Sequence, residues 1–209
     1  MRRLIYIPIV HTASDMGSMA RGLEQASIET AGVKQAAKQR AAVDEMWDGL
    51  ERKTLCLPLP TRFLLYQDGL PVCGIEEEII TKTADSGSRN YRLLVQLMAR
   101  GGVPMGTEDR KLLVEEYQSV KECIEASPRR KSAATLRYKE KSGRLLLARD
   151  AFVAQRVDET LPEEGLGLLF MGLLHRVDEG LPKDIDVHYL IYRLPFKRDF
   201  NLELLNGGD

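Results

Sequence analysis

The chain has 209 residues, of which 44% are hydrophobic, and its 30 Lys and Arg residues are balanced by 31 Asp and Glu residues. This length is typical of one domain or of two small ones, and the apolar content excludes an intrinsically disordered chain. The formal net charge of −1 removes the general electrostatic argument for a nucleic-acid partner.

Apolar runs predict five strands. The run 4–10 is continuously apolar and rich in β-branched residues, as is typical of a strand buried on both faces of a sheet. Further strands are expected at 63–66, 103–106, 166–171 and 187–192. The strand at 103–106 is the weakest of these predictions because it contains Pro104.

Helical patterns lie between these strands. They predict one or two helices in 18–53 with a break at Gly32, shorter helices near 74–85 and 89–100, an amphipathic helix at 108–126, and a long helix at 133–161 that is interrupted or bent near Gly143. The alternation predicts an α/β fold: a single domain over 1–209, with a mainly parallel central sheet of about five strands and helices on both faces. The segment 108–160 would then be a helical insertion.

The expected compartment is the cytoplasm. Cys56, Cys73 and Cys123 are odd in number and widely spaced, which argues against a disulfide framework or a zinc finger. The N-terminal residues imitate a signal peptide, but Pro8 and the lack of a small-residue cleavage site favour a buried strand. No stretch reaches the length of about 18 apolar residues that spans a bilayer, so no membrane partner is expected.

Polar residues follow four of the predicted strands. His11 follows the first strand, Asp68 the second, Glu108 the third and His175 the fourth. Ligands of open parallel sheets bind at the carboxyl ends of the strands, so we expect these side chains to meet at one edge. Each residue also has a structural explanation, as a hydrogen-bonded histidine, a turn residue or an acidic residue in a first helical turn. The third histidine, His188, lies inside a predicted strand and is interpreted as structural.

Two kinds of chemistry suit this set of residues. His11, His175 and Glu108 could bind a divalent metal ion such as Zn²⁺ or Mn²⁺ that holds a water molecule. Without a metal, a histidine oriented by a carboxylate can act as general base toward water, with Arg149 or Arg176 stabilising the developing negative charge. The sequence leaves both alternatives open.

Short motifs in the same regions resemble those of a known superfamily. Gly172-Leu-Leu-His175, directly after an apolar strand, resembles the G-x-x-H motif of the superfamily that contains TraB/TIKI-type proteins, erythromycin-esterase-like enzymes and ChaN haem-uptake lipoproteins. The matching motif after the first strand would be 8–11, with Pro8 where the family usually has Gly. The segment 149–154 resembles the family's R-[DN]-x-x-h-A segment, in which h is apolar, and the turn 106–109 resembles a carboxylate-bearing strand end of some members. Many relatives present a glutamate after the second strand, where this chain has Gln67-Asp68.

The resemblance implies a site but not a reaction. The superfamily includes metal-dependent peptidases, an antibiotic-inactivating esterase and haem-binding proteins, so the fold alone does not determine the activity. Our first hypothesis is a hydrolase of a small molecule or peptide, with a catalytic set that comprises His11, His175, Asp68, Glu108 and Arg149. The alternative is a non-catalytic protein of the same fold that binds a small molecule or haem or has a regulatory role, which Pro8 and the missing glutamate favour.

Two other surfaces have alternative interpretations. The segment 129–149 contains eight Lys or Arg residues and one Glu, which could contact phosphates, but a solvated helix face is the favoured interpretation, and nucleic acid is not an expected partner. The helix around Met46 and Trp47 could form a homo-oligomer interface or pack in the core of the monomer.

Overall fold

The computed structural model describes residues 1–12, 14–15, 20, 22, 25, 28, 32–127 and 129–193. Its centre is a five-stranded sheet with the strand order β3-β2-β4-β1-β5, and every strand pair is parallel. The strands are β1 (Arg2–Ile9), β2 (Phe63–Gln67), β3 (Gly102–Met105), β4 (Leu166–Gly172) and β5 (Ile185–Tyr189). The predicted α/β class with a parallel central sheet is therefore confirmed.

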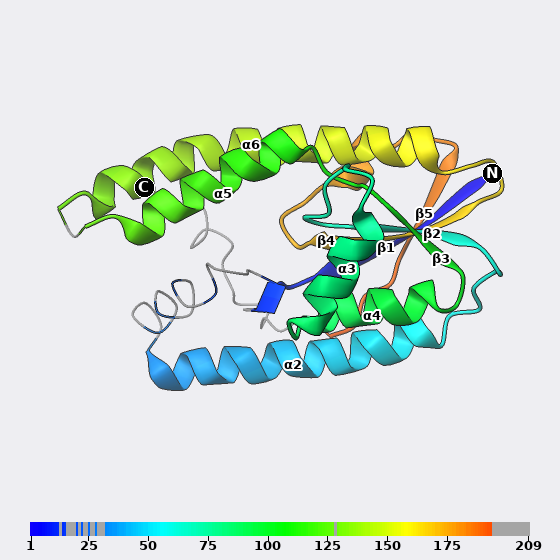
Figure 1. The fold of residues 1–209 in the computed structure, drawn as a ribbon, viewed down its shortest axis with the longest axis horizontal. Helices are drawn as coiled ribbons and strands as arrows, with labels where there is room; N and C mark the ends of the chain where they lie inside the picture. The colour runs from blue at the N-terminus through cyan, green and yellow to red at the C-terminus, as the bar shows by residue number, and fades with distance from the viewer. Residues whose placement is uncertain are drawn as a thin grey trace.

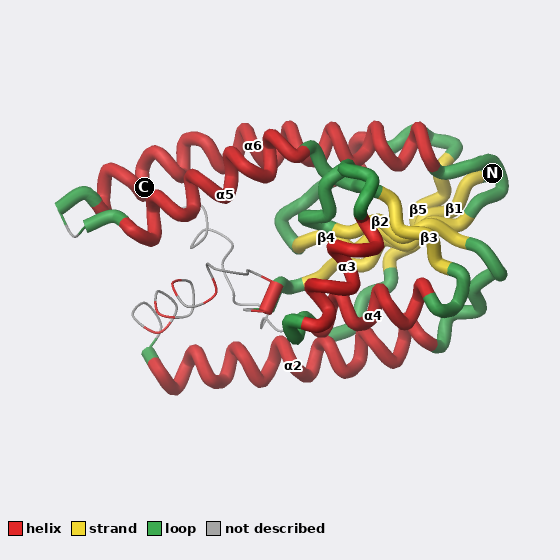
Figure 2. Tube along the Cα trace, in the orientation of Figure 1, coloured by secondary structure: helices red, strands yellow, loops and turns green. Residues whose placement is uncertain are grey.

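Helices cover both faces of this sheet, as predicted. One face is covered by α2 (Val33–Leu55), α3 (Glu76–Asp85) and α4 (Arg89–Met98), and the other by α6 (Lys131–Thr160) (Figure 1). Helix α5 (Arg110–Glu125) packs along α6, and the pair extends past the sheet, as does the first half of α2 (Figure 2). A short 3-10 helix, η2 (Val177–Gly180), follows β4.

Two apolar cores form because successive side chains of a strand point to opposite faces. In β2, Phe63 and Leu65 belong to the core beneath α2, α3 and α4, whereas Leu64 and Tyr66 belong to the core beneath α6. Met46 and Trp47 are buried in the first core, and the Trp47 indole donates a hydrogen bond to the Val10 carbonyl. Of the two alternatives for Met46 and Trp47, the structure thus shows packing in the core of the monomer.

Three positions at which Gly or Pro was expected to affect an element can be compared with the structure. Helix α6 continues without interruption through Gly143, since one helical glycine costs only about 1 kcal/mol relative to alanine. Pro104 is tolerated in β3 because β3 is an edge strand. Gly32, the predicted break, immediately precedes α2 and has a φ of 77°.

The parallel arrangement brings the carboxyl ends of all five strands to one edge. His11 lies two residues after β1, Asp68 directly follows β2, and Gly172 is the last residue of β4. Among the described residues, no helix has the length and apolar character needed to cross a membrane.

Candidate active site

Asp68 is the centre of a polar cluster at this edge. One of its oxygens, Oδ2, accepts a hydrogen bond from His11 Nε2 at 2.9 Å and lies 3.6 Å from His175 Nε2. The other oxygen, Oδ1, accepts a hydrogen bond from Arg149 Nη2 at 2.6 Å. Asp68 is 5% exposed, so these partners replace most of its contact with water. Three predicted residues, two of them from other strand ends, therefore contact this carboxylate.

Gly172 is the residue that lets Asp68 approach the backbone of β4. The Gly172 N–H donates a hydrogen bond to Asp68 Oδ2 at 2.9 Å. A Cβ atom at Gly172 would lie 2.9 Å from the same oxygen and 3.5 Å from both His11 Nε2 and His175 Cδ2. The glycine of the G-x-x-H motif is thus required by the close packing of the cluster.

Glu108 reaches the cluster because the loops after β2 and β3 are joined by backbone hydrogen bonds. The Leu70 carbonyl accepts hydrogen bonds from the N–H groups of Thr107 and Glu108, and Val72 N–H donates to the Glu108 carbonyl. The Glu108 side chain is fully buried, as expected of a carboxylate held by a paired cation rather than by water. The loop that carries Asp68 therefore also holds Glu108 in place.

Arg149 enters the cluster from α6 and binds three carboxylates. Its Nε and Nη2 donate to the two oxygens of Glu108 at 3.1 and 2.5 Å, and Nη2 also donates to Asp68. Its Nη1 donates to Glu116 on α5 at 2.6 Å. Arg176, the alternative cation, has a side chain that is 75% exposed and pairs with Glu179, so Arg149 is the arginine of this cluster.

The orientation of His175 is set by Asp150. His175 Nδ1 lies 2.5 Å from Asp150 Oδ1, while Asp150 Oδ2 accepts a hydrogen bond from the Arg176 N–H at 3.0 Å. Tyr6 also donates its hydroxyl to the His175 carbonyl at 3.3 Å. With Nδ1 protonated and donating to Asp150, the lone pair of the ring lies on Nε2, which faces Asp68.

The His11 loop is anchored to α4. Asp15 accepts hydrogen bonds from the backbone N–H and hydroxyl of Thr12 at 2.6 and 2.9 Å, and Ser88 donates its hydroxyl to the other Asp15 oxygen. Ser88 is also the N-cap of α4, where it accepts from Tyr91 N–H. This chain of contacts ties the residue after His11 to the first turn of a helix.

Burial and the neighbouring charges shift the pKa values of three groups in the cluster. Burial alone would raise the pKa of Asp68, but the hydrogen bond from His11 and the charges of His11, His175 and Arg149 hold it well below its usual range. Burial lowers the pKa of His11, yet the hydrogen bond to Asp68 and the charge of that carboxylate raise it overall. Burial, with the nearby Asp68 charge, raises the pKa of Glu108 despite Arg149. The site thus favours a charged His11–Asp68 pair.

Among the described residues, Asp68, Glu108 and His175 form a group that could hold a metal ion, because one donor atom of each lies within 4.8 Å of the others. The set predicted from the sequence was His11, His175 and Glu108. In the observed group Asp68 stands in place of His11, whose Nε2 is hydrogen-bonded to Asp68. The first histidine is therefore placed beside the donor set instead of within it.

Two carboxylates of the cluster were not predicted as site residues. Asp150 is the second residue of the R-[DN]-x-x-h-A segment. Its position next to Arg149 on a predicted helix is the sequence signal that could have identified it as a site residue. Glu116 had no distinguishing signal, since it is one of several acidic residues on an amphipathic helix. His188 lies outside the cluster, as predicted: it is in register with Ile5, near the middle of β1, and its Nε2 is 2.8 Å from Asp186.

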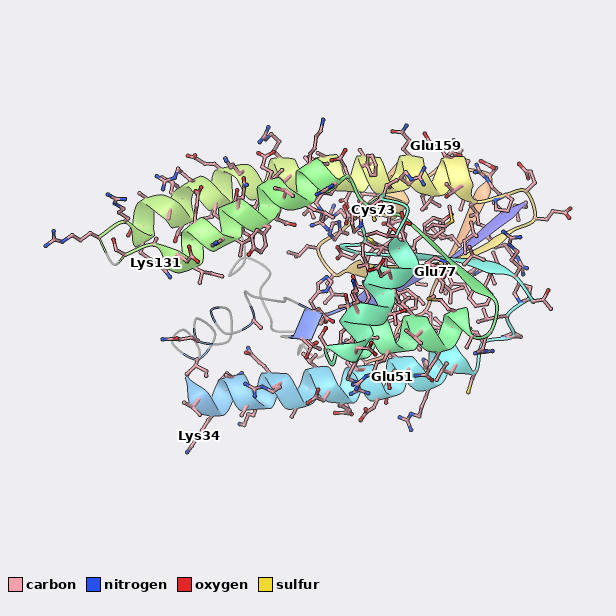
Figure 3. The ribbon with its side chains drawn as sticks, in the orientation of Figure 1. Lys34, Glu51, Cys73, Glu77, Lys131 and Glu159 are labelled. Carbon is pink, nitrogen blue, oxygen red and sulfur yellow. The ribbon has the colours of Figure 1, made fainter. Side chains whose placement is uncertain are left out.

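The basic segment 129–149 begins far from the site. Lys131 lies at the outer end of the α5–α6 pair, whereas Glu159 lies near the sheet (Figure 3). Since Arg149 follows Lys131 by 18 residues of helix, the two are separated by about 27 Å along α6. The beginning of the basic segment, around Lys131, therefore does not line the cluster.

No protein-family model, curated protein or solved structure matches the chain. The resemblance to the TraB/TIKI, erythromycin-esterase-like and ChaN superfamily therefore stays a prediction from short motifs.

Proposed function

We propose that the protein is a hydrolase whose active site is the cluster around Asp68, with a small molecule or a peptide as substrate. The observation that carries this proposal is the orientation of His175. Its Nδ1 is held by Asp150, and its Nε2 faces Asp68 beside Glu108. An imidazole held in this way presents the nitrogen that binds a metal ion or takes a proton from water.

The donor set suits a divalent metal ion such as Zn²⁺ or Mn²⁺. One imidazole nitrogen and two carboxylates are ligands that both ions accept. Three carboxylates, those of Asp68, Glu108 and Glu116, contact the Arg149 guanidinium, and a fourth, that of Asp150, holds His175. One guanidinium against four carboxylates leaves the cluster anionic when its histidines are neutral. A bound ion would supply Lewis acidity and lower the pKa of a bound water molecule.

His11 is the proton donor in this proposal. Its raised pKa, caused by Asp68, keeps the imidazole protonated at a higher pH than an isolated histidine. The His11 side chain is 26% exposed, whereas His175 is 5% exposed, so His11 is the histidine that a substrate can reach. We therefore assign His11 to protonation of the leaving group and His175 to the metal ion or to water.

Arg149 acts as a positioning residue. Four of its five N–H donors are used by Glu108, Asp68 and Glu116, which leaves little capacity for a negative charge on the substrate. Its role is to keep Asp68 and Glu108 ionised and adjacent, because two buried carboxylates without a cation would repel each other.

The test is to measure the metal content and turnover of purified protein together. Zn²⁺ or Mn²⁺ near one equivalent is expected, with hydrolysis of a panel of peptides and esters that a chelator abolishes. His175→Ala should lose both metal and turnover, while His188→Ala, the matched surface control, should lose neither. Purified protein with no metal and no turnover of any member of the panel would refute the proposal.

One observation favours a metal-free version of the same hydrolase. Arg149 Nη2 bridges Asp68 and Glu108, so a cation already satisfies these two carboxylates. His175, oriented by Asp150, would then be the general base toward water. Turnover that resists the chelator would select this version.

The second candidate function is binding without catalysis. The His175 imidazole would be the residue to hold haem iron, and Pro8 stands where the similar superfamily usually has glycine. A shifted haem absorbance spectrum in wild-type protein but not in His175→Ala, with no turnover, would select this function.

A further inference from the structure

Two buried amide side chains beside the cluster have unsatisfied polar atoms. Among the residues that the structure describes, neither Asn90 Nδ2 nor Asn90 Oδ1 has a hydrogen-bond partner, and Gln67 Oε1 also lacks one. Both side chains are 0% exposed. Buried polar side-chain atoms are nearly always paired, so two such residues in one region require an explanation.

Gln67 and Asn90 lie on the same face of the sheet. Side chains alternate along β2, so Gln67 points to the same face as Phe63 and Leu65, which is the face that α4 covers. Asn90 lies in the first turn of α4, one turn before the buried residues Leu93 and Leu94. Both residues therefore lie in the layer between β2 and α4.

They also lie at the same end of that face. Gln67 is the last residue of β2, directly before Asp68. The last turn of α4 leads into β3 through Gly101, so the first turn of α4 lies at the opposite end, near the carboxyl edge of the sheet. The hydrogen bond from Ser88 to Asp15 joins this first turn to the loop that follows His11. The two amides therefore flank the proposed active site.

The hydrogen bonds of Gln67 define which of its atoms is unpaired. Gln67 Nε2 donates to the Asp68 carbonyl at 3.0 Å, and a carbonyl oxygen can only accept, so the amide cannot be reversed. The unpaired atom is thus the acceptor Oε1. Asn90 offers one amide nitrogen and one oxygen in either orientation. Together the two residues present two acceptor oxygens and one NH₂ donor.

We propose that Gln67 and Asn90 form a subsite that recognises a primary carboxamide group of a ligand. The two N–H bonds of such a group match Gln67 Oε1 and Asn90 Oδ1, and its carbonyl oxygen matches Asn90 Nδ2. A carboxylate offers only acceptors and would leave both protein oxygens unpaired, while a guanidinium offers only donors. A urea group contains a carboxamide unit plus a second NH₂ group, and because both residues are fully buried only a small terminal group could reach them.

This inference depends on the proposed function in one respect, namely that the carboxamide belongs to the substrate of the adjacent site. Binding to the subsite does not depend on metal or turnover. It can therefore be measured directly with acetamide, a small primary carboxamide, whether or not the protein hydrolyses anything.

The experiment is a titration of the protein with acetamide, followed by the side-chain NH₂ resonances of Asn90 and Gln67 in ¹H–¹⁵N NMR spectra. We expect saturable shifts of both resonances in the wild-type protein. Acetate should bind at least about tenfold more weakly than acetamide, because a site built to pair with N–H groups discriminates against a group that lacks them. The His175→Ala variant should bind acetamide as the wild type does, which separates this result from failure of the hydrolase proposal.

Asn90→Leu is the decisive variant, and Gln118→Leu, at an exposed amide of α5, is its matched control. Asn90→Leu should bind acetamide at least about tenfold more weakly than wild type, without a loss of thermal stability, because the change removes two unsatisfied buried atoms. Gln67→Met serves as a second variant, with the same expected loss, where Asn90→Leu does not fold. Wild-type protein that shows no saturable shift, or variants that retain wild-type affinity, would overturn the inference.

Discussion

Replacing Asp150 by Asn should reverse the tautomer of His175. Asp150 accepts two hydrogen bonds, one from His175 Nδ1 and one from the Arg176 backbone N–H. An asparagine has only one acceptor oxygen, and the backbone N–H can only donate, so the oxygen is expected to face Arg176. The asparagine NH₂ group then faces His175 Nδ1, which must become the acceptor, and the ring proton moves to Nε2.

A protonated Nε2 can neither bind a metal ion nor accept a proton. Loss of the orienting partner of a metal-bound histidine typically costs 10- to 100-fold in metal affinity, which corresponds to about 1.4–2.7 kcal/mol. We expect a decrease of that size in the Zn²⁺ affinity of Asp150→Asn, measured by competition with a chromogenic chelator. Long-range ¹H–¹⁵N NMR spectra of the imidazole would report the tautomer directly in the metal-free protein.

The chain provides a matched control for this experiment. Asp186 and His188 form a second carboxylate–histidine pair, with 2.8 Å between Asp186 Oδ2 and His188 Nε2, at an exposed position of β5. Asp186→Asn should change neither the Zn²⁺ affinity nor the tautomer of His175. An Asp150→Asn protein in which His175 keeps its Nδ1 proton and its Zn²⁺ affinity would refute the reasoning, since the orientation of His175 would then not depend on Asp150.

The remaining predictions concern the glycine of the cluster, the long helix and stability at alkaline pH. Gly172→Ala should lower turnover by about 100-fold while the protein stays folded, because the alanine Cβ would lie 2.9 Å from Asp68 Oδ2 and displace that carboxylate. Unchanged turnover would show that the reaction does not depend on this position of Asp68. Gly143→Ala should raise the free energy of unfolding by about 0.5–1 kcal/mol in urea titrations, because Gly143 is exposed in α6 and a Cβ there would meet no atom within 4 Å; a decrease would contradict this. Burial raises the pKa of Tyr66 from 10.0 to about 12, so the folded state holds the Tyr66 proton more tightly than the unfolded state does. The Tyr66 proton thus contributes about 2–3 kcal/mol to the free energy of unfolding below pH 10, and this contribution is lost as the pH rises from 10 to 12. Tyr66→Phe should therefore lose less stability over that range than wild type, and an equal loss in both proteins would contradict this prediction.

The fold class could be predicted from the sequence, but the order of the strands could not. The runs 4–10, 63–66 and 166–171 are apolar throughout, because both faces of each strand are covered by helices. The same uniformity removes the information about pairing, since no strand has a polar face that would identify its neighbour. That β4 lies between β1 and β2 depends on how the α5–α6 segment crosses the sheet, which is a property of tertiary packing.

The strand-end rule explains which parts of the site could be predicted. His11, Asp68 and His175 follow strands of one parallel sheet. Residues of this kind lie at the same edge of the sheet whatever the order of the strands. Asp150 and Glu116 reach the cluster from helices, so their positions depend on the docking of α6 and α5 against the sheet and on each other. A rule based on strand ends cannot detect them. Arg149 was identified from its motif and its charge.

The same distinction explains why the metal-binding group differs from the predicted one. Sequence reasoning selected both histidines because imidazole is a common ligand of zinc, and it treated each strand end as an independent donor. In the structure these side chains are hydrogen-bonded to one another. His11 Nε2 donates to Asp68, and Asp68 also accepts hydrogen bonds from Arg149 and from the Gly172 N–H. The group that could hold an ion is instead set by which donor atoms the packing brings within 4.8 Å of one another, namely those of Asp68, Glu108 and His175. His175 Nδ1 is paired with Asp150, which leaves Nε2, 3.6 Å from Asp68 Oδ2, as the nitrogen that carries the lone pair. The helix residue that the strand-end rule missed is thus the one that gives the predicted histidine its chemistry.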